Sequence, residues 1–250
     1  MNSLPFAKCL SLAGLALLLA ACQTFTSPPK DKPLEAQRIA WEHRRDGCQA
    51  DDCALINVDT LRFIEEPALS ELIERRLLAM TDDSPDRAPA ATLQDYEKEF
   101  LTRAGVRWAT YLQAKIIDQH DQLTVIELSS YLETGGAHGM PGRGFINYDR
   151  QQDRALTLQD VLLPGQEEAF WRLAAQAHQR WLAENKFAQE PGFAANWPFQ
   201  RTDNVALKKD EVLLKYPVYS IAPYAAGHPE LHLPYAQLQG ILQPQYLPKK

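Results

Sequence analysis

The sequence lacks several features that would assign a function directly. Its 250 residues contain no GxxxxGK[ST] phosphate-binding loop, no GxSxG nucleophile elbow and no HExxH zinc-protease helix. Acidic residues outnumber basic residues by 32 to 26, which gives a formal net charge of −6 at pH 7. The chain therefore lacks the basic footprint of nucleic-acid-binding proteins. A mildly acidic balance instead favours a cationic partner.

Only one long apolar run is present, and it lies at the start of the chain. Residues 9–21 follow a single basic residue, Lys8, a pattern typical of a secretory signal peptide and too short for a stable membrane span. The run ends in LAAC, which resembles the lipobox of bacterial lipoproteins and implies cleavage after Ala21 and acylation of Cys22. Cleavage of an ordinary signal peptide at the same bond is the alternative. No second run of eighteen apolar residues follows, so we expect attachment to the membrane by the lipid anchor alone.

The residues after Cys22 indicate the compartment and the domain boundary. Gln23, rather than an aspartate, follows the cysteine, and its resemblance to Gram-negative sorting signals implies an outer-membrane lipoprotein facing the periplasm. The next stretch is polar and proline-containing, which predicts a flexible tether. We therefore expect a signal peptide at 1–21, a lipidated tether at 22–40 and one folded domain at 41–250. Loss of Lys8 with the signal takes the formal charge from −6 to −7.

Cysteine is scarce, and its distribution predicts one disulfide. Of the four cysteines, Cys9 lies in the signal peptide and Cys22 is the acylation site, which leaves Cys48 and Cys53. In an oxidising periplasm these two are expected to form a disulfide that closes a short loop. They make a poor zinc site, because His43 is the only neighbouring histidine. We expect no metal and no cofactor.

Hydrophobic periodicity predicts an α+β fold for residues 41–250, with a mainly antiparallel sheet and three to four packed helices. Helices are expected at 67–80, 92–104, 167–185 and 234–242. Strands are expected at 55–63, 107–119, 122–134, 144–149, 204–218 (as a hairpin) and 231–233. The domain divides into an N-terminal part, 41–105, and a second part, 106–250.

Five of the twelve glycines fall within residues 133–144, ETGGAHGMPGRG. The stretch is expected to join two strands and not to open a helix, so it does not fit a phosphate cradle. Gly135 and Gly136 permit positive φ angles or the close approach of another chain. Two interpretations remain from the residues alone. The loop contacts a partner, or it is a tight β-connection in which His138 packs on a neighbouring strand.

A catalytic role would require His138 to lie beside a nucleophile and an orienting carboxylate. Glu133 and Asp149 are the carboxylates that a hydrolase would use. His228 and His232 are the one closely spaced histidine pair, but their proline and apolar neighbours favour a structural role over a metal site. We expect no enzyme activity and keep a hydrolase using His138 as an alternative.

Two stretches of the chain resemble the extracytoplasmic domain of the RsiV family. The first contains Tyr131, the TGGAHG motif at 134–139, NYD at 147–149 and LxD at 158–160. The second contains IAPY at 221–224, Gly227 and LPY at 233–235. Within that family the domain binds C-type lysozyme, and the same module precedes the catalytic domain of PdaC-type peptidoglycan deacetylases. The present chain has neither the anti-sigma segment and membrane span of RsiV nor a deacetylase domain.

The resemblance implies a lipid-anchored envelope protein that binds a macromolecular ligand without catalysis. A lysozyme-like protein is the first candidate ligand and peptidoglycan the second, and we expect a monomer that does not bind nucleic acid. An envelope assembly role, with docking through the aromatic loop 187–202, is the alternative. The implied ligand-binding residues are Thr134, Gly135, Gly136, Ala137, His138, Gly139, Ile221, Ala222, Pro223, Tyr224 and Gly227.

Overall fold

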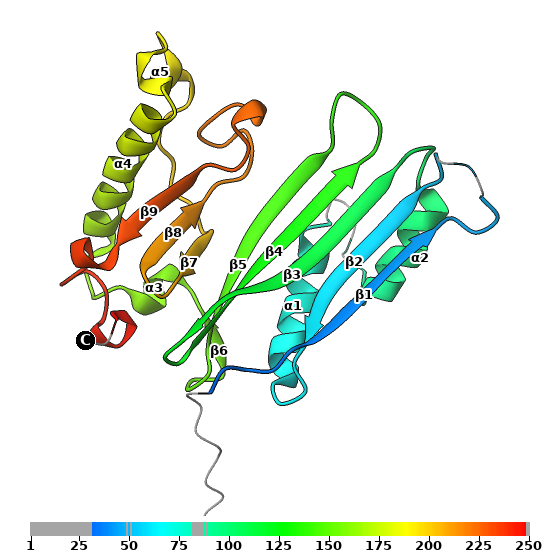
Figure 1. Ribbon diagram of the computed structural model, residues 1–250, viewed down its shortest axis with the longest axis horizontal. Coiled ribbons are helices and arrows are strands. Elements are labelled where there is room, and N and C mark those ends of the chain that lie inside the picture. Colours follow the sequence, from blue (N-terminus) through cyan, green and yellow to red (C-terminus); the bar gives the residue numbers. More distant parts are fainter. Residues whose placement is uncertain (1–31, 49, 51, 82–87, 89, 249–250) are drawn as a thin grey trace, which may run out of the picture.

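The computed structural model describes residues 32–248, apart from 49, 51, 82–87 and 89. The predicted signal peptide and the acylation site at Cys22 lie outside these residues. The chain forms a six-stranded sheet and a three-stranded sheet, with helices on the outer face of each (Figure 1). No helix in the described part of the chain is both long and apolar enough to cross a membrane. The α+β prediction is confirmed.

The larger sheet has the strand order β1-β2-β3-β4-β5-β6, and every neighbouring pair is antiparallel except β2 and β3. Its strands are β1 (Gln37–Arg44), β2 (Leu55–Arg62), β3 (Ala109–His120), β4 (Leu123–Glu133), β5 (Met140–Asp149) and β6 (Arg154–Leu156). The parallel pair requires a crossover. Helices α1 (Pro67–Ala79) and α2 (Leu93–Arg103) supply it and cover one face of the sheet.

Local sequence signals explain both crossover helices. Pro67 occupies the first turn of α1, where its missing N–H costs no hydrogen bond. Helix α2 begins after Thr92, whose hydroxyl accepts a hydrogen bond from the amide of Asp95. Leucine, isoleucine and phenylalanine side chains at helical spacing fill the space between the helices and the sheet. The fully buried ones are Leu69, Ile73, Leu77 and Phe100.

The smaller sheet has the antiparallel order β7-β8-β9 and is covered by one long helix. Its strands are β7 (Val205–Leu207), β8 (Glu211–Lys215) and β9 (Glu230–Pro234), and the helix is α4 (Glu167–Glu184). The short helix α3 (Leu158–Val161) precedes α4 and begins with a capping box formed by Thr157 and Asp160. Phe170, Trp171, Ala174 and Ala177 of α4 pack on the sheet in one core cluster.

Three expectations about the elements need correction. Strand β1 was not predicted, and it begins at Gln37, inside the expected tether at 22–40. The last predicted helix, 234–242, is only the 3-10 turn η3 (Tyr235–Gln237), because Gly240 has a φ of 73° and Leu242 forms a β-bridge with Leu162. Strand β8 ends at Lys215, although a strand was expected to continue to residue 218.

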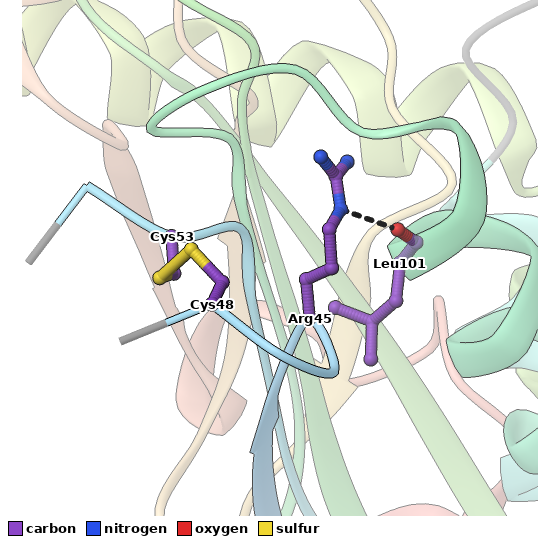
Figure 2. Close-up of a disulfide and its surroundings, with 4 residues drawn as sticks. All are labelled: Arg45, Cys48, Cys53 and Leu101. Atoms are coloured by element: carbon purple, nitrogen blue, oxygen red, sulfur yellow. Dashed lines mark hydrogen bonds between the residues drawn. A yellow bond between two sulfur atoms is a disulfide. The ribbon is translucent and has the colours of Figure 1, made fainter. Parts of the chain in front are cut away.

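The predicted disulfide between Cys48 and Cys53 is present (Figure 2). It lies in the connection between β1 and β2, which are paired along their whole length. Beside it, the side-chain Nε of Arg45 donates a hydrogen bond to the carbonyl oxygen of Leu101 at 3.0 Å (Figure 2). The disulfide closes the loop between the two strands, and the Arg45 bond joins this end of the hairpin to the last turn of α2.

One side chain, Asn147 of β5, joins the two sheets. Its Nδ2 donates to the carbonyl oxygen of Val205 at 2.8 Å, and its Oδ1 accepts from the amide of Leu207 at 2.7 Å. The side-chain amide thus occupies the edge of β7 as a neighbouring strand would. In the reverse direction, Asn204 Nδ2 donates to the carbonyl oxygen of Arg143 on β5 at 2.9 Å. These bonds define the seam between β5 and β7 (Figure 1).

An ion cluster adds to the seam on the face of β4 away from α1. Lys215 Nζ of β8 lies 2.7 Å from Glu127 Oε1 of β4 and 2.9 Å from Glu230 Oε1. Burial opposes the lysine charge, but the hydrogen bonds to the two carboxylates outweigh it, and the pKa of Lys215 is raised. Lys215 is therefore positively charged at neutral pH and ties the small sheet to the large one.

We predict that Asn147→Leu destabilises the protein by about 2–4 kcal/mol, because it leaves a buried carbonyl and a buried amide of β7 without partners. The free energy of unfolding in urea measures this effect. Asn185→Ala is the matched control, since Asn185 is exposed and makes one local bond to Trp181. Equal stabilities of the two variants would show that the seam does not depend on the amide.

Three histidines, one buried and two half-buried, are kept neutral by the fold. Burial lowers the pKa of His178, and burial is also the largest cause of the lowered pKa values of His120 and His228. His178 of α4 is 1% exposed, and neither ring nitrogen has a hydrogen-bond partner among the described residues. Its ring lies among aromatic side chains and stacks on Trp181 with centroids 6.2 Å apart.

We predict that stability falls with acidification. The pKa of each of these histidines is lower in the folded chain than the value near 6.5 in the unfolded chain, so below that pH the unfolded chain binds more protons. The stabilisation is complete above pH of about 6.5 and is lost as the pH falls through the folded pKa values. Urea unfolding at pH 7.5 and 5.5 tests this, and His178→Leu should reduce the difference by on the order of 1 kcal/mol. Identical pH dependence in both proteins contradicts the prediction.

Candidate functional site

The glycine-rich loop joins β4 to β5, as predicted, and it is exposed. Residues 134–138 are all solvent-exposed, whereas Gly139, just before β5, is buried. Gly135 and Gly136 have φ angles of 87° and 124°, which side chains other than hydrogen rarely allow. The carboxylate of Glu133 accepts a hydrogen bond from the amide of Gly135 at 2.8 Å. The loop therefore has a defined shape and presents little side-chain bulk.

The loop and the IAPY segment meet through two rings. The imidazole of His138 stacks on the ring of Tyr224 with centroids 3.8 Å apart and planes at 21°. The hydroxyl of Tyr224 donates to the carbonyl oxygen of Gly139 at 2.9 Å. These two contacts connect the β4–β5 loop of the large sheet with the β8–β9 connection of the small sheet, 85 residues away along the chain.

Tyr219 completes this contact, and the hydrogen bonds determine the tautomer of His138. His138 Nδ1 lies 3.1 Å from the carbonyl oxygen of Gly139, which can only accept, so Nδ1 carries a proton. In the neutral ring Nε2 is then the acceptor, and the Tyr219 hydroxyl donates to it at 3.0 Å. Tyr219 is 47% exposed and has a φ of 65°, an uncommon backbone conformation for a bulky residue. Such strain is often found at functional sites.

Two tyrosines of the sheet extend the ring cluster. A Cβ added to Gly139 would lie 2.3 Å from Cζ of Tyr131, so only glycine allows the strand to pass beneath this ring. Tyr131 in turn meets Tyr111 of β3 edge-to-face, with centroids 5.8 Å apart, and Tyr111 is 39% exposed. We call the side chains of these five residues the aromatic surface: Tyr111, Tyr131, His138, Tyr219 and Tyr224.

The remaining residues of the predicted site divide into exposed and buried groups. Thr134 and Ala137 lie on the exposed loop, and Pro223 is half-buried. Ile221 and Ala222 are 0% and 1% exposed, and their side chains belong to two core clusters. Their side chains thus cannot reach a ligand, and they anchor the segment that carries Tyr224. Gly227 has a φ of 69° and ends the 3-10 turn η2 (Tyr224–Ala226).

The arrangement around His138 does not resemble a hydrolase dyad. Its ring nitrogens face a carbonyl oxygen and a tyrosine hydroxyl, and neither faces a carboxylate. Asp149, the more distant candidate partner, is 1% exposed and accepts hydrogen bonds from the amides of Gln151 and Gln152 in the turn after β5. Among the residues that the structure describes, no group of three or more histidine, cysteine or acidic side chains could hold a metal ion.

The sequence did not reveal Tyr219 or Tyr111 as members of the site. Tyr219 lies two residues before the IAPY motif, and no pattern marks its left-handed backbone. The position of Tyr111 depends on the pairing of β3 with β4, in which Tyr111 is opposite Tyr131. The alternation of side chains along β4 places Tyr131 on the polar face of that strand. The alternation alone does not show which residue of β3 lies opposite Tyr131, because that depends on the register of the two strands.

The aromatic loop 187–202, the alternative docking segment, directs much of its apolar surface inward. Phe187 and Phe193 stack with centroids 4.3 Å apart, and Phe193 is 6% exposed. They share a cluster with Leu182 of α4 and with Ala222, next to the IAPY tyrosine. The loop therefore supports the segment that carries Tyr224.

Comparison with known proteins identifies similar chains in three bacteria. Residues 159–236 match the family described as "Protein of unknown function (DUF3298)". A DUF3298 family protein from Pseudomonas aeruginosa PAO1, known from its crystal structure, is 54% identical in sequence to this chain. The two structures match with a TM-score of 0.84 over 88% of this chain and 100% of that one. A member from Bacteroides fragilis NCTC 9343 shares the fold at 20% identity, with a TM-score of 0.66 over 85% of this chain and 94% of that one.

A curated relative is also similar over part of its length. The peptidoglycan-N-acetylmuramic acid deacetylase PdaC of Bacillus subtilis (strain 168) is 24% identical over 161 residues, which are 62% of this chain. The match covers 33% of PdaC, so the chain spans about a third of that relative. The similarity agrees with the expected likeness to a region of PdaC-type deacetylases.

We predict that Tyr224→Phe loosens the loop without unfolding the protein, because it removes only the hydrogen bond to Gly139, worth about 1 kcal/mol. Hydrogen exchange of the amides of residues 134–139 should become faster, while the exchange of the β4 and β5 amides stays unchanged. Tyr111→Phe is the control, since among the described residues no hydrogen bond involves the Tyr111 hydroxyl. Unchanged exchange in the Tyr224 variant would show that the bond does not order the loop.

Proposed function

The chain belongs to the DUF3298 family, and from this premise we propose that it is a lipid-anchored envelope protein that binds a macromolecular ligand without catalysis. The observation that supports the proposal is the exposed 134–138 loop held against Tyr224 and Tyr219 by the ring of His138. Two separate parts of the chain, each matched by the RsiV resemblance, contribute to one surface.

The surface has the physical character of a protein-binding site. Exposed tyrosine rings supply large contact areas at a low cost in side-chain entropy, and tyrosine is enriched among the residues that dominate binding energy. The glycines leave main-chain donors and acceptors of the loop accessible to a partner. Because the rings are fixed by hydrogen bonds and by the strands beneath them, little ordering is required on binding.

A lysozyme-like muramidase is the ligand we favour. The formal charge of the chain is −6, or −7 after loss of Lys8, and a cationic partner is attracted to such a protein at low salt. The resemblance to the RsiV family, in which the domain binds C-type lysozyme, points the same way. The outer-membrane anchor at Cys22 would place the surface in the periplasm.

Peptidoglycan glycan is the second candidate ligand. The exposed rings of Tyr111 and Tyr219 offer apolar faces on which a sugar ring can stack. The similarity to a protein named for its action on peptidoglycan supports a cell-wall ligand as well. An assembly role through loop 187–202 has less support, because Phe187 and Phe193 of that loop pack on each other.

We predict that the protein retains lysozyme at low salt and reduces its muramidase rate, and that Tyr219→Ala weakens binding by at least about tenfold, since centrally placed aromatic residues carry a large share of binding energy. Calorimetry with lysozyme, and in parallel with soluble glycan fragments, gives the affinities. Val106→Ser is the control, because Val106 is 67% exposed and lies outside the aromatic surface.

The two assays separate the ligands. Binding of glycan fragments that is lost in Tyr219→Ala, with no retention of lysozyme, assigns the surface to peptidoglycan. Binding of either ligand with the same affinity by Tyr219→Ala and Val106→Ser would place the contact elsewhere. Neither ligand binding at low salt refutes both versions of the proposal.

A further inference from the structure

Within the described part of the chain, no strand lies along the outer edge of the eight-residue strand β1. β1 is the first strand in the sheet order, so only β2 pairs with it among the described residues. Exposed edges offer unpaired amides and carbonyls to other chains, and natural proteins usually block them with charged side chains, proline, a bulge or a covering segment. Strand β1 has charged side chains of both signs, Arg38, Glu42 and Arg44, which can repel or attract a second strand according to the register. Residues 37–44, QRIAWEHR, contain no proline and no glycine, and their pairing with β2 has no register shift.

The opposite edge of the same sheet is blocked. On β5, Pro141 has no amide proton to donate, the side chain of Asn204 binds the carbonyl oxygen of Arg143, and β6 pairs with residues 147–149. The contrast indicates that the edge at β1 is left open while the edge at β5 is closed.

The backbone direction of β1 is fixed by one hydrogen bond. The amide of Arg45, just after β1, donates to the carbonyl oxygen of Ala54, just before β2. In an antiparallel pair, successive residues direct their backbone groups alternately to the two sides. The amides and carbonyls of Arg38, Ala40 and Glu42 therefore point to the open edge, where a second strand would find them.

We propose that β1 pairs antiparallel with β1 of a second copy of this chain, about a two-fold axis at Ala40. In this register Arg38 lies opposite Glu42 of the second copy, and Glu42 lies opposite its Arg38. On the other face, Ile39 lies opposite Trp41, again twice. The outward amides and carbonyls of Arg38, Ala40 and Glu42 then pair with those of Glu42, Ala40 and Arg38 in the second copy.

The charges select this register over its neighbours. A two-fold axis at Trp41 would place Arg38 opposite Arg44 of the second copy, and an axis at Glu42 would bring the two Glu42 carboxylates together. An axis at Ile39 would place Arg38 opposite Ala40 and Glu42 opposite Ala36. Neither charge would then face an opposite charge. Opposite charges directly across two strands stabilise the pair and like charges oppose it, so the axis at Ala40 is favoured.

The side chains involved are free to reach across. Arg38 has a 72% exposed side chain, although it pairs with Asp59 of its own sheet at 2.7 Å. The hydrogen bond from Arg38 is the main cause of the lowered pKa of Asp59. The Asp59 carboxylate holds the guanidinium of Arg38 on the same face of the sheet as Glu42. Glu42 accepts a bond from Asn57 at 2.9 Å and is itself exposed. A second carboxylate can thus join an arginine that is already oriented.

The apolar side of the edge also has room for this pairing. A hollow of about 400 Å³ lies along the helix-facing side of β1, lined by Ile39, Trp41, Phe63, Ile64 and Pro67 among others. Ile64 is 62% exposed there. The Ile39–Trp41 pairs of a joined sheet would lie at the rim of this hollow and shield part of it from water.

Disulfide trapping with Ala40→Cys tests the proposed axis. The two Cα atoms at position 40 would be about 5.5 Å apart, within the range of a disulfide. Oxidation of the intact chain in the membranes of an expressing bacterium should give a covalent homodimer. Arg44→Cys is the matched control, since its two copies would lie roughly 26 Å apart along the strands. The parent chain measures any background from its remaining cysteines.

Charge exchange on the Ala40→Cys background then tests the register. Arg38→Glu and Glu42→Arg each place like charges opposite each other twice, so we expect the trapped dimer to fall by roughly fivefold in each. Co-expression of the two variants with different tags should restore trapping between them, because opposite charges again face each other. This restoration also shows that each variant is folded.

Three results would overturn the proposal. These are equal trapping at positions 40 and 44, trapping of a different protein in place of a second copy, and single charge variants that trap as well as the parent. None of them bears on the aromatic surface, so the proposed ligand binding stands or falls separately.

Discussion

The position of the aromatic surface depends on the side-chain amide of Asn147. The loop with His138 belongs to the large sheet and the segment with Tyr224 belongs to the small sheet, so the relative placement of the two sheets decides whether the rings meet. Asn147 presents a donor and an acceptor to the edge of β7 with the spacing of a peptide group. A hydrophobic contact alone would permit sliding between the sheets, whereas these two bonds fix the register of β7 against β5.

The residues that carry the resemblance to the RsiV family are of two kinds: some hold the two sheets and their helices in place, and others form the contact surface. NYD, LxD and LPY are structural. Asn147 forms the seam, Asp160 caps α3, and the hydroxyl of Tyr235 donates to the carbonyl oxygen of Lys208 at 2.7 Å. The TGGAH loop and Tyr224 instead meet at the surface. A shared pattern of this type therefore indicates a common scaffold and a common contact region at once, and the structure shows which residues belong to each.

The same distinction explains what the sequence could predict. Helices α1, α2 and α4 and the hairpin of β3 and β4 have strong periodicity and capping residues such as Thr92, and all were predicted. Strand β1 was missed because most of its side chains are exposed, which leaves no apolar alternation to detect. The last helix was wrong because tertiary pairing of Leu242 with Leu162 and the left-handed Gly240 outweigh local propensity. The resemblance assigned His138 and Tyr224 to one expected site, but their stacking and the positions of Tyr219 and Tyr111 required the three-dimensional structure.

The missed strand also changes what the surface could recognise. A two-fold axis at Ala40 is perpendicular to the sheet, because residues directly opposite in an antiparallel pair share one face. Both copies would then present their aromatic surfaces on the same side of the joined sheet, at opposite ends of the paired strands. A compact ligand such as lysozyme would bind each surface independently, and its affinity would not change with pairing. A long polymer such as a glycan strand could contact both surfaces, and the second contact would then occur at a high effective concentration. Pairing through β1 would thus strengthen the binding of a polymer and leave the binding of a small protein unchanged, so the dependence of affinity on Arg38 and Glu42 distinguishes the two ligand classes.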